Sequence, residues 1–145
     1  MIWCREHSLD YQPVVFPGFS WHNLKPESVL KQILRPTGGF LWSQFVAAKR
    51  AGAGVIYVAM FDEVDEGTAI FKCTNEPRVG PNPFLTYEGL PSDYYLQLTS
   101  EGARLLRGVI PVSNKLPLPI PNSAEREATG RSVQSSMKQP QKKHL

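Results

Sequence analysis

The sequence predicts an α/β fold made of two consecutive β–α units, with the elements in the order strand, helix, strand, helix. The second predicted strand, residues 54–61 (GVIYVAMF), is apolar at nearly every position, which is typical of a parallel strand buried on both faces. Two such strands cannot form a stable sheet alone, because each needs a neighbour along its outer edge. We therefore expect residues 1–121 to be the end of a larger α/β sheet or barrel. A (β/α)₈ barrel takes roughly 250 residues, and two units are about a quarter of one.

The first predicted unit begins after residues 1–10, which read as the end of a helix or as an ordered lead-in. Residues 11–19 (YQPVVFPGF) form the first predicted strand, and a Pro-Gly pair ends it. A short helix is expected near residues 27–34, because Pro26 suits a first helical position. The longer helix of this unit is expected over residues 40–50, where apolar residues recur at helical spacing before two glycines.

The second predicted unit begins with a strand over residues 54–61, in which Tyr57 is expected to belong to the core. Residues 73–91 are rich in proline, glycine and asparagine and read as a loop. The last helix is expected over residues 92–108, with Ser92 as its N-cap and a glycine at its end. The buried stripe of this helix is expected to comprise Tyr95, Leu98, Leu105 and Leu106.

Composition and charge narrow the possible function. The net charge of +3 belongs to residues 122–145, which hold five basic and two acidic side chains and are expected to be a disordered tail. The first 121 residues hold 11 basic and 11 acidic side chains, so a nucleic-acid partner is not expected. The sequence holds no apolar run of 18 residues, so no membrane span is expected. Its first ten residues, MIWCREHSLD, lack the apolar region of a secretory signal. Cys4 and Cys73 are expected to be free thiols, and neither a cofactor nor a metal is expected.

An acidic cluster follows the second predicted strand. Asp62, Glu63, Asp65 and Glu66 fall at its carboxyl end, where β/α folds place their active sites. Carboxylates this close repel one another, which favours one that keeps a proton beside one that stays ionised. Such a pair can act as general acid and general base. A solvated acidic turn and a cation-binding loop are the alternative interpretations.

A second polar segment follows the first predicted strand and would lie at the same end. Trp21 offers a flat apolar face, and His22 and Asn23 offer polar groups beside it. This combination suits a sugar ring or another ligand with polar edges. The alternative is that Trp21 packs the loop onto the rim of the barrel while its two neighbours are exposed.

Four segments, PVVFPGFSWHN, GGFLWSQ, IYVAMFDEVDEGTAIFK and LPSDYYLQLTSEGARLLRG, resemble the C-terminal part of glycoside hydrolase family 71/99-like proteins. Those proteins are (β/α)₈ barrels, and some carry the label xylosidase/arabinosidase. The resemblance covers roughly residues 1–120. It implies hydrolysis of the O-glycosidic bonds of a polysaccharide or oligosaccharide, with a carbohydrate as the partner.

The active-site segment of family 99 reads Asn-Glu-Trp-His-Glu-Gly-Thr, and residues 62–68 read Asp-Glu-Val-Asp-Glu-Gly-Thr. The resemblance implies that Glu63 acts as base on the 2-hydroxyl of the sugar. It also implies that Glu66 acts first as general acid and then as general base for water. The sequence departs from the family segment at Asp62, Val64 and Asp65. The residues expected to line the sugar site are Trp21, His22, Asn23, Asp62 and Asp65.

By the same resemblance the chain supplies only the last two β–α units, so its partner would be the N-terminal part of the barrel. A complete active site needs groups from several strand ends. We therefore expect the chain alone to be a truncated form with little or no hydrolytic activity. The alternative is a non-catalytic carbohydrate-binding or cation-binding remnant.

Overall fold

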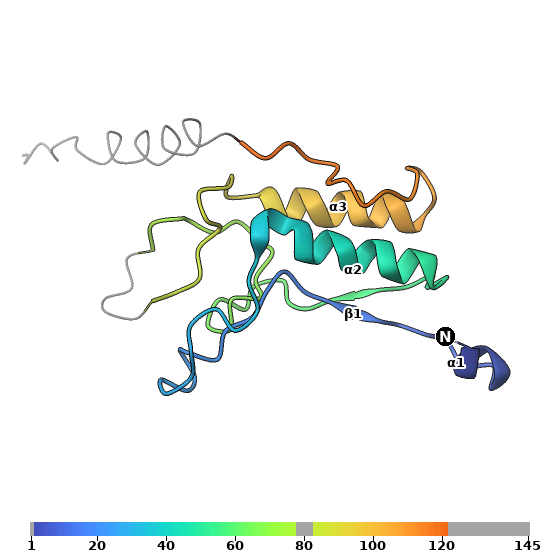
Figure 1. Cartoon of the computed structure of the whole chain (residues 1–145), viewed down its shortest axis with the longest axis horizontal. Helices are drawn as coiled ribbons and strands as arrows, with labels where there is room; N and C mark the ends of the chain where they lie inside the picture. Colours follow the sequence, from blue (N-terminus) through green and yellow to red (C-terminus); the bar gives the residue numbers. More distant parts are fainter. Residues whose placement is uncertain (1, 78–82, 122–145) are drawn as a thin grey trace, which may run out of the picture.

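A computed structural model describes residues 2–77 and 83–121 of the chain (Figure 1). Its elements in chain order are α1 (Ile2–Glu6), β1 (Val14–Val15), the 3₁₀ turn η1 (Pro36–Gly38), α2 (Gly39–Arg50), β2 (Tyr57–Val58) and α3 (Tyr94–Leu106). This order confirms the two predicted β–α units and the helix before them. The predicted disordered tail lies outside the described residues.

The two strands pair in parallel, as the β–α–β order predicts. Val14 faces Tyr57 and Val15 faces Val58 in the register of the pair. Each strand is only two residues long, so the predicted strands over residues 11–19 and 54–61 are too long. Strand pairing persists only where a neighbouring strand continues it, and within the described ranges these two strands have only each other.

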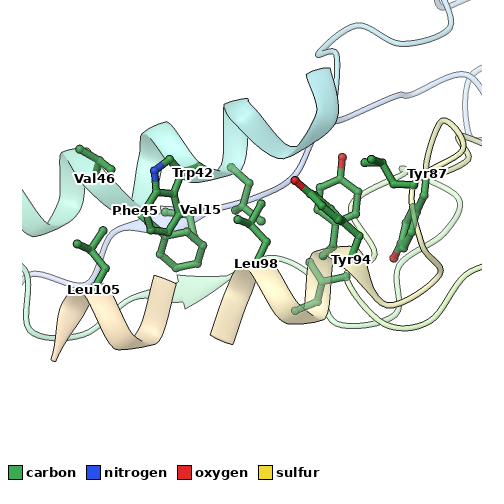
Figure 2. Packing of buried hydrophobic residues seen from close by; sticks show 12 residues of the cluster. Val15, Trp42, Phe45, Val46, Tyr87, Tyr94, Leu98 and Leu105 are labelled. Atoms are coloured by element: carbon green, nitrogen blue, oxygen red, sulfur yellow. The ribbon is translucent and has the colours of Figure 1, made fainter. Parts of the chain in front are cut away.

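Helices α2 and α3 pack against each other and face the same side of the strand pair (Figure 1). Their apolar stripes meet in a core of leucines, valines and aromatic rings (Figure 2). The helices approach closely at Gly102, where a β-carbon would lie 2.5 Å from a ring carbon of Phe45. Trp42, Tyr94 and Tyr95 belong to this core, and Tyr95 was predicted to do so as part of the buried stripe of α3.

The opposite face of the strand pair is uncovered. Val14 is 55% exposed and Tyr57 is 46% exposed. The prediction that Tyr57 belongs to the core is therefore wrong for the described structure, since its side chain lies on the face that no helix covers. In a complete barrel this face would point inward, toward the side chains of the other strands.

Two local predictions are also wrong. Residues 27–34 form turns rather than a helix, because Lys31 adopts φ 60 and Ile33 pairs with Phe19 in an antiparallel bridge. Helix α3 begins at Tyr94 instead of residue 92, so Ser92 is not its N-cap. Within the predicted stripe of α3, Leu106 is only half-buried, whereas the other three members are buried.

Candidate active site

The segments that follow β1 and β2 lie against each other at one end of the strand pair. The backbone amide of Ser20 donates a hydrogen bond to the carbonyl of Glu66, at 2.8 Å. The side-chain amide of Asn23 donates a longer one to the carbonyl of Asp65, at 3.4 Å. The structure therefore brings the acidic cluster and the Trp21–Asn23 segment together, as expected for the carboxyl ends of parallel strands.

Backbone hydrogen bonds build the acidic segment into a closed turn. The carbonyl of Glu63 accepts hydrogen bonds from the amides of Thr68 (3.1 Å) and Ala69 (2.8 Å). The amide of Met60 donates to the carbonyl of Thr68, at 3.1 Å, and closes the base of the turn. One carboxylate oxygen of Glu63 also accepts a hydrogen bond from the amide of Asp65, at 2.9 Å. We call residues 62–68 the acidic turn.

The four carboxylates of the acidic turn have different surroundings. Asp62 and Asp65 are exposed, whereas Glu63 and Glu66 are half-buried. The carbonyls of both glutamates also accept backbone hydrogen bonds. The turn therefore holds two partly buried carboxyl groups, a residue type used in general acid–base catalysis.

The Ser20–Asn23 segment is anchored from beneath by Ser20. Its hydroxyl is buried and accepts hydrogen bonds from the amides of His22 (3.3 Å) and Lys31 (3.4 Å). The imidazole Nδ1 of His22 lies 2.8 Å from the carbonyl of Ser28. A carbonyl can only accept, so Nδ1 donates to it, and this hydrogen bond fixes the orientation of the ring.

Trp21 is half-buried and packs within its own loop. Its ring lies edge-on to Phe19, with centroids 5.1 Å apart, and the ammonium of Lys25 lies 4.6 Å from its centroid. These contacts agree with the interpretation in which the tryptophan packs the loop. The role of Trp21 in sugar binding stays a prediction.

Sequence reasoning missed Arg35, the buried basic residue behind the acidic turn. Its guanidinium donates hydrogen bonds to the carbonyls of Gly67 and Ala69. The rings of Tyr87 and Tyr95 each lie 5.0 Å from its central carbon. No spacing marked these residues, because they meet only through contacts between distant segments.

The two tyrosines beside Arg35 act as neutral hydrogen-bond donors. Burial raises the pKa of Tyr95 above its ordinary value, and burial together with Cys73 does the same for the pKa of Tyr87. The hydroxyl of Tyr95 donates to the carbonyl of Arg35 at 3.1 Å, and that of Tyr87 donates to the carbonyl of Ala69 at 3.2 Å. Both phenols therefore stay protonated while they hold the backbone around the acidic turn.

A mostly apolar cavity of about 270 Å³ lies beside the acidic turn. Val64, at the middle of the turn, forms part of its wall. The other lining residues are Phe71, Lys72, Cys73, Thr74, Pro77, Phe84 and Leu85. Cys73 and the distant Cys4 are both free thiols, as predicted.

Metal-binding and membrane-spanning features were searched over the described ranges. Within residues 2–77 and 83–121, no three histidine, cysteine or acidic side chains are gathered in a way that could hold a metal ion. In the same ranges, no helix is long and apolar enough to cross a membrane.

Comparison with known proteins gives matches among solved structures. The GH99 endo-α-mannosidase from Bacteroides thetaiotaomicron in complex with Bis-Tris propane is 27% identical over 74% of this chain, with a TM-score of 0.67. A second structure of the GH99 endo-α-mannosidase from that organism is also 27% identical over 74% of the chain, with a TM-score of 0.66. The chain has a family 99-like fold. No protein-family model matches it, and no curated protein does.

The similarity covers a limited part of these enzymes. The chain spans 33% and 31% of the length of the two solved chains. The match supports the α/β fold predicted for part of a barrel, of which the described residues form two parallel strands and their helices. Both neighbours are described as mannosidases, so the xylosidase/arabinosidase label gains no support from them.

Proposed function

We propose that this chain supplies the catalytic glutamates and part of the sugar-binding wall of a glycosidase that hydrolyses O-glycosidic bonds in an oligosaccharide or polysaccharide. One observation carries the proposal. The acidic turn is held against the Ser20–Asn23 segment at the carboxyl ends of two parallel strands, in a chain with a family 99-like fold.

In this proposal Glu63 is the base that acts on the sugar 2-hydroxyl, and Glu66 is the general acid and later the general base. The position of the acidic turn against the Ser20–Asn23 segment supports these roles, because a general acid and a general base must lie within reach of the same bound sugar. The residues proposed to contact the sugar are Trp21, His22, Asn23, Asp62 and Asp65. The fixed orientation of His22 supports its role, since a ring held by Nδ1 leaves Nε2 available for a sugar hydroxyl.

The reaction also needs the other β–α units of a barrel, wherever they are encoded. The uncovered apolar face of β1 and β2 supports this requirement, because such strands are normally buried between neighbours. We therefore expect little or no hydrolysis from the 145-residue chain alone. The solved neighbours make an α-mannoside the first substrate to test, and xylosides and arabinosides form the second panel.

A complementation assay tests the proposal. The full chain is mixed with the Bacteroides thetaiotaomicron enzyme lacking its superposed third, and product release is measured by mass spectrometry. We expect hydrolysis by the assembly, reduced by about a hundredfold or more in Glu63→Gln and Glu66→Gln. Glu76→Gln changes an exposed glutamate outside the acidic turn and should leave the rate unchanged.

Two results would contradict the catalytic role. One is hydrolysis that survives both glutamine substitutions at the wild-type rate. The other is an assembly that melts cooperatively yet releases no product from any substrate in the panels. If such an assembly still binds oligosaccharide, the chain is a non-catalytic carbohydrate-binding protein.

A further inference from the structure

Arg35 occupies an unusual position for a charged side chain. It is only 3% exposed and lies between the Phe19–Ile33 bridge and the 3₁₀ turn η1. Its Nε donates a hydrogen bond to the carbonyl of Gly67 at 3.0 Å, and its Nη2 donates to the same carbonyl and to that of Ala69, the latter at 3.3 Å. Gly67 directly follows Glu66, so the guanidinium bonds the backbone next to the proposed general acid.

The surroundings of Arg35 fix its side chain in place. Tyr95 lies at the start of α3 and bonds the carbonyl of Arg35, while its ring and that of Tyr87 flank the guanidinium. On the other side, a β-carbon on Gly18 would lie 2.6 Å from the Cγ atom of Arg35. Arg35 is thereby held against the first turn of α3.

Stability alone does not account for a cation at this position. Burying a charge costs free energy, and among the described residues no carboxylate forms an ion pair with Arg35. An apolar side chain of similar length could fill the same space. The planar fork of arginine donates from Nε and Nη2 in a fixed geometry that matches the carbonyls of Gly67 and Ala69. A lysine ammonium is a point charge on a flexible stem and does not fix its acceptors in this way.

Glu66 is held from two sides. The amide of Ser20 bonds its own carbonyl at 2.8 Å, and Arg35 bonds the carbonyl of the next residue. Gly67 has φ +66, and a β-carbon there would lie 2.5 Å from Leu85. This backbone conformation favours glycine, and a side chain at this position would be strained. These contacts set the direction in which the Glu66 side chain leaves the turn.

We propose that Arg35 is a positioning residue for Glu66, which it acts on through the carbonyls of Gly67 and Ala69. The proposed effect of Arg35 on catalysis rests on the proposed function, whereas its effect on the conformation of the acidic turn does not. The two parts are therefore tested by separate measurements on the same variants.

The first measurement is amide hydrogen exchange by NMR on the full chain. Arg35→Lys keeps the charge and removes the fork, and Arg35→Met removes both. We expect exchange of the Ser20 amide to become about tenfold faster or more in each variant, because its acceptor is the carbonyl of Glu66. Exchange of the Ala51 amide, which bonds the carbonyl of Ala47 at the end of α2, should stay within about twofold.

Lys49→Met is the matched control. The ammonium of Lys49 donates to the carbonyl of Leu106 at 2.7 Å, so this variant also removes a cation from a carbonyl, but far from the turn. It should leave the Ser20 amide unchanged. Unchanged exchange at Ser20 in Arg35→Lys, or equal acceleration at Ser20 and Ala51, would overturn the proposal. If Arg35→Met does not fold, Arg35→Lys alone decides.

The second measurement uses the complementation assay. For a positioning residue we expect Arg35→Lys to lower kcat about tenfold and to leave KM within about twofold, because the substrate-contacting residues are intact. An unchanged kcat in an active assembly would overturn the catalytic part. If the wild-type assembly folds but is inactive, the proposed function fails, and the exchange result still decides whether Arg35 holds the acidic turn.

Discussion

The two faces of the strand pair differ sharply. Val15 points toward the helices and is 2% exposed, whereas Val14, its neighbour on the same strand, is 55% exposed on the opposite face. On the first face, α2 and α3 contribute a continuous apolar core (Figure 2). On the second face, no described element covers the strands. Strand β1 therefore has one face packed against helices and one face that is exposed.

This difference distinguishes the core that the chain forms by itself from the contacts that further strands would have to provide. The helix-covered face gives the chain a core of its own, and that core anchors Arg35 and the acidic turn through Tyr95. The open face corresponds to the inside of a barrel, where the remaining strands would pack. The candidate site lies at the boundary, because its backbone is fixed from the helix side while its side chains would complete a pocket on the other.

The largest expected effect concerns the layer between α2 and α3. Leu98 is fully buried there, and Leu98→Ala should lower the free energy of unfolding by about 2 to 5 kcal/mol. Leu34→Ala, at an exposed leucine, should change it by less than about 0.5 kcal/mol. Urea denaturation of the full chain measures both. Similar losses in the two variants would show that the described core does not stabilise the fold.

A smaller effect is expected within β1 itself. Val15→Ala should lower the free energy of unfolding by about 2 kcal/mol, because it removes a side chain buried against the helices. Val14→Ala should change it by no more than about 0.5 kcal/mol in the chain alone. If the open face packs against further strands, Val14→Ala should become costly in the complemented assembly. An equal cost at both valines in the chain alone would mean that the outer face is already covered.

The sequence predicted the elements with strong local signals. The apolar repeat of α2 and the two β–α units were recoverable because periodicity and turn residues are local properties. The helix expected over residues 27–34 was wrong because a long-range bridge from Phe19 overrides the local preference. The proximity of Asp62–Glu66 and Trp21–Asn23 could be predicted because strand ends are visible in sequence. Arg35 was missed because its contacts are with residues 32 and 34 positions away.

The smallest effect is expected where the helix layer meets the acidic turn. Tyr95→Phe removes the hydrogen bond to the carbonyl of Arg35 and should cost about 1 kcal/mol near neutral pH. Burial raises the pKa of Tyr95 above its ordinary value of 10.0, so the unfolded chain loses this proton at a lower pH than the folded chain. The contribution of the neutral Tyr95 phenol to the free energy of unfolding is complete below pH 10 and is lost as the pH rises above it. The advantage of the wild type over Tyr95→Phe should therefore shrink above pH 10.

Urea denaturation at pH 8, 10 and 11 measures this change, with Tyr11→Phe as the matched control at an exposed tyrosine. If the stability difference between the wild type and Tyr95→Phe is the same at all three pH values, Tyr95 is not held neutral by burial. If it narrows as expected, the phenol is closed off from water on the helix side of the molecule. The acidic turn would then be attached to a dry interior through Arg35, although its own carboxylates stand at the surface.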